Sequence, residues 1–206
     1  MRPMAMKGGR ARGRPAGGSD AIVDAILATT LTHLEEHGFE DLSVEEVARA
    51  AGVNKTSVYR RRPSKADLVL AAVGSVRESE PPFVESGDLR SDLVQLLEAK
   101  AASLATPLGQ NVGRALMALL GTARREGNEA LLNERPSPRR ALLARAIAGG
   151  ELPPDADADF LDELLTAPLL RRILIRNEPV DTAYVTRVVD HVLAAARARP
   201  TGPSGS

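Results

Sequence analysis

Residues 55–61 form a run of hydrogen-bonding side chains of the kinds that recognise nucleic acid: Lys55, Thr56, Ser57, Val58, Tyr59, Arg60 and Arg61. Arginine pairs well with the edge of guanine, and threonine and serine hydroxyls bind bases or phosphates. If this segment is a helix, its polar side chains can point outward while Val58 faces the preceding helix. Tyr59 can pack with its ring and donate its hydroxyl to a phosphate. These residue types favour a helix that reads DNA.

The charge distribution supports a local anion-binding surface, although the formal net charge of the chain is zero. Residues 1–19 contain five basic residues and no acidic one, and residues 54–65 repeat that balance. Between them, residues 20–53 hold eight acidic residues and a single basic one. Two compact basic segments on an otherwise acidic chain indicate a site for a polyanion. Charge alone leaves open the alternative of a solvated charged face.

The elements that must position residues 55–61 are short helices joined by a tight turn. Ser43 can cap a helix in which Glu46 stands three residues later. That helix must end near Gly52, and the next segment, 54–61, is closed by Pro63. Two short helices joined by a glycine turn predict a helix-turn-helix, in which the second helix enters the major groove.

The remainder of the chain also has helical periodicity, and no alternating run argues for strands. The predicted fold is therefore all α, with a three-helix module at the N-terminus, a larger helical domain after it, and about nine helices in total. The best candidate boundary is Glu80-Pro81-Pro82. It divides the chain into a basic arm over 1–18, a helix-turn-helix domain over 19–80, a helical domain over 81–198 and a disordered tail over 199–206. Pro168 is expected to kink a helix over 158–176.

Residues 19–68 resemble the DNA-binding part of the tetracycline-repressor (TetR) family. The residues that carry this resemblance are Phe39, Leu42 to Ala48, Ala51-Gly52-Val53, Lys55, Tyr59-Arg60 and Pro63-Ser64-Lys65. The order of the later helices is also similar. A subset of the family has a tail like Gly149-Gly150-Glu151-Leu152, Pro168-Leu169-Leu170 and Glu178-Pro179-Val180-Asp181.

The resemblance implies a homodimer that binds a palindromic operator in double-stranded DNA. It also implies that a small-molecule effector binds the C-terminal domain and releases the protein from DNA. The positions it places near DNA are Ser43, Lys55, Thr56, Ser57, Tyr59, Arg60, Arg61 and Lys65.

Position 62 departs from the family pattern, in which a large aromatic residue usually packs into the module. This chain has Arg62 there. Either the arginine stem covers the apolar surface while its charge stays in solvent, or the local packing differs.

The arm contains Arg12-Gly13-Arg14-Pro15, directly before the helix-turn-helix. Arginines that flank glycine in an extended segment can enter an A·T-rich minor groove, where the potential is most negative. We expect Arg12 and Arg14 to contact DNA in this way, and the alternative is a solubilising tail.

The two helices expected at the end of the chain, over 158–176 and 181–197, are strongly apolar. Paired with their symmetry mates they would form a four-helix dimer interface, as in the family. The alternative is ordinary core packing within one subunit.

A ligand pocket is expected among the helices between Leu89 and Leu174. Candidate ligand contacts are the polar residues that interrupt apolar faces there, namely Gln110, Asn111, Arg114 and Arg171. Such residues are more often solvated or satisfied within the fold. Aromatic residues are scarce in this half, so an aliphatic or irregular effector suits it better than a planar one.

The residues argue against an enzyme. The chain has no P-loop, dinucleotide fingerprint or Gly-x-Ser-x-Gly elbow, and it has no cysteine. His33 and His37 have a spacing that can bind metal, but no third ligand is evident, so solvated histidines are the favoured interpretation. No cofactor or metal is expected. No apolar run reaches the roughly 18 residues of a membrane span, and Met1 to Arg14 lacks the apolar core of a signal peptide, so we expect a cytoplasmic protein without a membrane partner.

The sequence thus predicts a dimeric, sequence-specific transcription regulator, and more specifically a repressor that a small molecule releases from DNA. One alternative is an activator, or a regulator whose ligand promotes binding. A different class remains open as well, a helical protein-interaction module whose basic segment contacts an acidic partner.

Overall fold

The computed structural model describes residues 17–79, 83–126 and 137–198, which fold into helices and connecting loops without a strand. The helices are α1 (Gly17–His37), α2 (Val44–Ala50), α3 (Lys55–Arg61), α4 (Lys65–Ser79), α5 (Leu89–Ala105), α6 (Pro107–Glu126), α8 (Pro138–Ala148), α9 (Ala158–Leu170), the π turn η1 (Arg171–Ile175) and α10 (Thr182–Arg197). The predicted all-α fold class is confirmed. The predicted boundary at 80–82 lies outside the described residues, as do residues 1–16 of the arm and the tail over 199–206.

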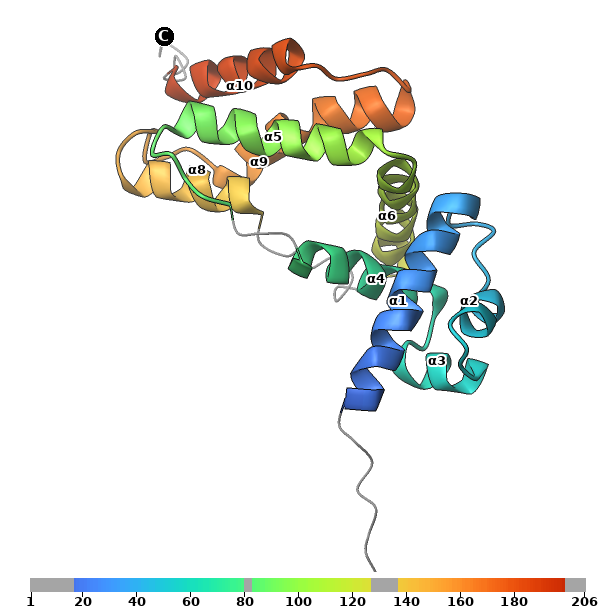
Figure 1. The fold of residues 1–206 in the computed structure, drawn as a ribbon. Coiled ribbons are helices and arrows are strands. Elements are labelled where there is room, and N and C mark those ends of the chain that lie inside the picture. The colour runs from blue at the N-terminus through green and yellow to red at the C-terminus, as the bar shows by residue number, and fades with distance from the viewer. Residues whose placement is uncertain (1–16, 80–82, 127–136, 199–206) are drawn as a thin grey trace, which may run out of the picture.

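The helices gather at two ends of the molecule, with α6 between them (Figure 1). At one end, α1 to α4 surround an apolar core that includes Leu34, Val47, Val58 and Leu68. At the other end, α5, α8, α9, η1 and α10 surround a larger core of mostly leucine and valine side chains. The two cores are separate, and the helices at each end of the molecule bury their apolar surface around one of them.

Helix α6 packs against both ends. Ala115 is 1% exposed within the core of the head. On the side of the body, Gly113 lies so close to Leu174 of η1 that an added Cβ would come within 2.7 Å of its Cδ1. A larger residue at position 113 would therefore require the side chain of Leu174 to shift.

The C-terminus of α1 is held by a contact from α6. Gly38 has a φ of +74° and ends the helix, and its N–H donates to the carbonyl of Leu34 at 3.0 Å. The side-chain amide of Asn111 donates to the carbonyls of Leu34 and Glu35, both at 3.0 Å. These bonds satisfy carbonyls that a helix end leaves without an intrahelical partner, and they tie the head to α6.

Most helix starts follow the local signals in the sequence. Ser64 and Asp67 form a capping pair, since each accepts a hydrogen bond from the backbone N–H of the other, at 3.0 and 3.1 Å. Ser137 caps α8 with Pro138 in its first turn, and Asp181 accepts from Tyr184 N–H at 2.7 Å to begin α10. Short polar side chains at these positions replace the missing backbone acceptors of the first turn.

The segment around Pro168 changes helix type instead of continuing as one α-helix. Proline has no N–H, so the regular i to i−4 bond is lost at this residue. The N–H of Arg171 is shared between the carbonyls of Ala167 and Pro168, and the π turn η1 follows. The irregularity expected at Pro168 is thus a widened turn directly after it.

Asp92 of α5 anchors the loop that leads into the body. Its carboxylate is 2% exposed and accepts hydrogen bonds from the N–H of Ser86 at 2.9 Å and from its hydroxyl at 2.7 Å. These bonds, the one from the backbone N–H first, lower the pKa of Asp92 below its ordinary value.

This lowered pKa predicts a stability that is lost in acid. The ionised form of Asp92 is favoured in the folded state, so its contribution is complete above the unfolded pKa and disappears as the pH falls through the folded one. In Asp92→Asn we expect the melting temperature to fall less steeply with pH below about 4 than in the wild type. Thermal melts across this pH range measure the slope, and Asp155→Asn, at an exposed carboxylate, is the matched control. Equal slopes for wild type and Asp92→Asn would contradict the assignment.

Candidate nucleic-acid interface

Helices α2 and α3 are joined by the tight turn that the sequence predicted. Ser43 caps α2 by accepting from Glu46 N–H at 3.4 Å. After α2, Gly52 has a φ of +67°, a left-handed conformation that strains other residues. Asn54 then caps α3 by accepting from Thr56 N–H at 2.8 Å. The turn and both caps together set the angle at which α3 leaves α2.

Helix α3 presents its polar side chains outward, as predicted. Val58 is fully buried in the core of the head. Lys55, Thr56, Tyr59 and Arg60 are exposed, whereas Ser57 and Arg61 are half-buried. Because α3 lies at the outer edge of the head in Figure 1, its exposed face is open to a large partner such as a DNA duplex.

Two of the exposed basic residues of α3 differ in their surroundings. Lys55 forms an ion pair with Glu45 of α2, and its Nζ lies 5.5 Å from the centre of the Tyr59 ring. This hydrogen-bonded pair lowers the pKa of Glu45 and raises the pKa of Lys55. Arg60 has no hydrogen-bond or ion-pair partner among the described residues, so its guanidinium is available to bases or phosphates. Sequence reasoning missed Glu45, whose only signal was an acidic residue at the start of the preceding helix.

Ser43 and Lys65 both make contacts within the head that stabilise its structure. The hydroxyl of Ser43 is the cap of α2. Lys65 donates to the carbonyl of Glu40 at 2.7 Å, and its Nζ lies 4.8 Å from the centre of the Phe39 ring. Both residues stay candidates for phosphate contacts. Arg12 and Arg14, predicted to enter the minor groove, lie outside the described residues.

Arg62 leaves a hollow beside the head's core. Its side chain is half-buried, and its Nη1 lies 3.4 Å from the carbonyl oxygen of Arg61. Arg61 and Arg62 border a hollow of about 240 Å³, whose apolar walls are Val23, Ile26 and Leu27 of α1 and Val58 of α3. The arginine stem therefore lies beside the apolar surface, but it does not fill the space against it.

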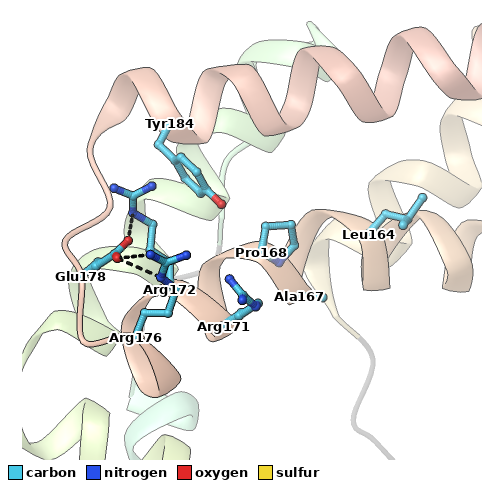
Figure 2. A pocket seen from close by; sticks show the side chains of 8 residues that line it. All are labelled: Leu164, Ala167, Pro168, Arg171, Arg172, Arg176, Glu178 and Tyr184. Carbon is cyan, nitrogen blue, oxygen red and sulfur yellow. Dashed lines mark hydrogen bonds and ion pairs between the residues drawn. The ribbon is translucent and has the colours of Figure 1, made fainter.

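The four residues proposed for a ligand lie in different places. Asn111 holds the end of α1, and Gln110 accepts a hydrogen bond from Arg114 at 3.3 Å. Arg171 lines a hollow of about 420 Å³ between α9, η1 and α10, where none of the other three residues lies (Figure 2).

Four further residues of this hollow were not predicted, namely Arg172, Arg176, Glu178 and Tyr184. Arg176 pairs with Glu178 at 2.7 Å, and the Arg172 guanidinium lies 4.6 Å from the centre of the Tyr184 ring. The cluster of arginines after Pro168 was the available signal in the sequence.

His33 and His37 stack their rings on α1, with centroids 5.4 Å apart. Within the described ranges, no group of three or more acidic, histidine or cysteine side chains is arranged to hold a metal ion. In the same ranges, none of the helices combines the length and the apolar character needed to cross a membrane.

Comparison with known proteins matches both halves of the chain to one family. Residues 26–72 match the family described as bacterial regulatory proteins, tetR family, and residues 83–192 match the tetracyclin repressor-like C-terminal domain. The chain belongs to the TetR family of transcription regulators. An HTH-type transcriptional regulator of Mycobacterium tuberculosis (strain ATCC 25618 / H37Rv) is 36% identical over 184 residues, which cover 86% of this chain and 88% of the relative.

Two further relatives support this membership in the TetR family. The DNA-binding transcriptional repressor TetR of Mycobacteroides abscessus is 33% identical over 82% of this chain and 90% of its own length. The crystal structure of the TetR family transcription regulator SCO0332 is 33% identical with a TM-score of 0.64, over 87% of this chain and 99% of that one. The similarity therefore extends over both the head and the body.

The Glu45–Lys55 pair predicts that Glu45 lowers the affinity of this TetR-family head for DNA. A phosphate must compete with Glu45 for Lys55, and the carboxylate also repels the phosphate backbone. We expect Glu45→Gln to bind duplex DNA roughly three- to tenfold more tightly at moderate salt, because both effects are removed. Fluorescence anisotropy with a labelled duplex measures the affinity, and Asp24→Asn on α1 controls for net charge. An affinity unchanged from the wild type would show that Lys55 does not reach a phosphate.

The hollow beside Arg62 predicts that the aromatic residue usual in the family would stabilise this head. Arg62→Phe should raise the free energy of unfolding by about 1 kcal/mol, because the ring would bury apolar surface against α1 and Val58. Chemical denaturation measures this free energy. Arg60→Phe, which places the same ring on the exposed face of α3, should give no increase, and a destabilised Arg62→Phe would show that the hollow is not accessible to the ring.

Proposed function

We propose that this TetR-family regulator is a homodimeric repressor that reads a palindromic operator and is released by a small-molecule effector. The observation that carries the proposal is the exposed polar face of α3, held outward by the buried Val58 and by capped helix ends. A major groove accepts a helix of this kind, and two copies would place their α3 helices in successive grooves about 34 Å apart.

The proposed contacts divide by role. Arg60 and the hydroxyl residues Thr56 and Ser57 would read base edges, whereas Lys55 and Tyr59 would hold phosphates. Ser43, Arg61 and Lys65 would add contacts to the backbone of the duplex. Arg12 and Arg14 of the arm over 1–18 would enter the adjacent minor groove.

The proposed release works through α6. A ligand that moves α6 would act directly on α1, because Asn111 bonds to the end of α1 and Ala115 lies in the core of the head. Ligand binding would favour a spacing of the two α3 helices that no longer fits successive grooves. Gln110 and Arg114 of α6 remain ligand contacts in this proposal. The amide of Asn111 is already engaged by α1, and Arg171 lies in a separate hollow away from these three residues.

The proposal also assigns a role to each domain and a location to the protein. The head over 19–80 would bind DNA, and the body over 81–198 would bind the effector and the second copy. The protein would act by binding and not by catalysis, in the cytoplasm. The name of the Mycobacteroides abscessus relative, which is a repressor, supports repression over activation.

Selection of bound duplexes from a random DNA pool at physiological salt tests the core of this proposal. We expect an inverted repeat whose half-sites lie about one helical turn apart. Failure to enrich any sequence, with the protein folded, would favour a protein-interaction module in which the basic face of α3 contacts an acidic partner. A reporter gene controlled by the selected sequence then distinguishes repression from activation.

Mutation of α3 gives the sharpest prediction for this function. The double substitution Tyr59→Ala/Arg60→Ala should weaken binding to the selected duplex at least about 100-fold, because a base contact and a phosphate contact are lost. The oligomeric mass should not change, since both side chains lie on the exposed face of α3. Anisotropy and light scattering measure the two quantities, with Arg140→Ala on α8 as the control. Undiminished binding by the double variant would show that α3 is not the reading helix.

A further inference from the structure

Helix α9 and the turn η1 carry an exposed apolar stripe. Phe160 is 56% exposed, Leu164 37% and Ile175 67%. With the exposed residues Ala167 and Arg171, these positions recur every three or four residues and so lie on one face of the helix. Large apolar side chains clustered along one exposed face mark an interaction surface.

The charges along this segment run from acidic to basic, and most of them are paired within the chain. Asp159 pairs with Arg140, and Asp162 pairs with Arg139 at 2.7 Å. At the other end, Arg172 and Arg176 both pair with Glu178.

Glu163 and Arg171 are the exceptions. Both side chains are exposed, and neither has a hydrogen-bond or ion-pair partner among the described residues. One acidic and one basic side chain of the same exposed helix surface are therefore left for a partner outside the chain.

Glu163 and Arg171 lie at equal distances in the sequence on either side of Ala167. Glu163 stands four residues before Ala167, and Arg171 stands four residues after it. An antiparallel copy of the helix with its symmetry axis at Ala167 would place each Glu163 opposite the partner's Arg171. A parallel copy would instead oppose like charges at both positions, which is unfavourable.

The apolar residues follow the same relation. Phe160 lies seven residues before Ala167, and Ile175 lies eight residues after it. The π turn η1 holds more residues per turn than an α-helix and takes up the extra residue. Each Phe160 would therefore meet the partner's Ile175, and the small side chain of Ala167 permits a close approach at the axis.

We propose that a second copy of this chain packs antiparallel on α9 and η1, in a register set by two Glu163–Arg171 pairs about an axis at Ala167. The hollow of Figure 2 then becomes part of the interface, where Pro168, Arg172 and Tyr184 receive the partner's Leu164. The contact is self-complementary, as twofold dimers require. This inference rests on the proposed homodimer and names the residues that determine its pairing.

Charge reversal tests the register. Glu163→Arg and Arg171→Glu each place two like-charged pairs in the homodimer, so we expect each to raise the dimer dissociation constant at least about tenfold. Combining both changes in one chain restores opposite charges and should return the constant to within about threefold of the wild type. Asp155→Arg, a matched reversal at an exposed acidic residue before α9, should have no effect. Sedimentation velocity measures the dissociation constants, and circular dichroism confirms that each variant is folded.

Mixing the two single variants makes the test specific to contacts between chains. A heterodimer of Glu163→Arg with Arg171→Glu contains only opposite-charge pairs, so dimers should reappear on mixing. If the single variants dimerise like the wild type, or if neither mixing nor the double variant restores the dimer, the register is wrong.

Failure of this inference can be told apart from failure of the proposed function. A wild-type monomer would overturn both the register and the dimeric part of the function. Selection of a DNA sequence by such a monomer would still establish a sequence reader. A wild-type dimer that selects DNA but ignores the charge reversals would overturn the register alone.

Discussion

The apolar core of the head is completed by a helix from the other half of the chain. Ala115 of α6 lies in this core with residues of α1 to α4, and Leu108 and Val112 pack against it. Asn111 bonds to the last carbonyls of α1 from the same helix. On its other side α6 meets Leu174 of η1 at Gly113. The core of the head is therefore complete only while α6 is in place, and a shift of the body that moves α6 acts directly on α1.

This dependence explains how helices as short as α2 and α3 are held. Each has seven residues, too few for a stable isolated helix in water. Their stability comes from Val47 and Val58, which are fully buried, and from caps at their N-termini. Because packing uses only one face of α3, its other side chains contribute little to the fold and are available for DNA. The Glu45–Lys55 pair shows that this exposed face also has contacts of its own before any partner binds.

The exposed surface of the body on α9 and η1 combines charges that are unpaired among the described residues with apolar side chains. On α9 and η1 the charges not paired within the subunit are placed symmetrically about a small residue, with exposed apolar residues on either side. The π turn after Pro168 decides where Ile175 and the neighbouring arginines point. This turn contributes Arg171 and Arg172 to the hollow and Ile175 to the face that a second copy would cover.

The helical class, most helix starts and stops, the glycine turn and the inward direction of Val58 can be predicted from the amino-acid sequence. These features depend on bonds and periodicities that span at most a few residues, so short sequence patterns are enough to predict them. The tertiary structure was needed to show that Asn111 bonds to the end of α1, that Lys65 bonds to the carbonyl of Glu40, and that a hollow remains beside Arg62. Asn111 and Leu34 are 77 positions apart, and no local pattern predicts which helices become neighbours. The candidate DNA residues could be predicted from the sequence because one helix carries most of them. The hollow at Arg171 could not, because it joins residues of α9, η1 and α10, which come together only when their apolar faces share a core.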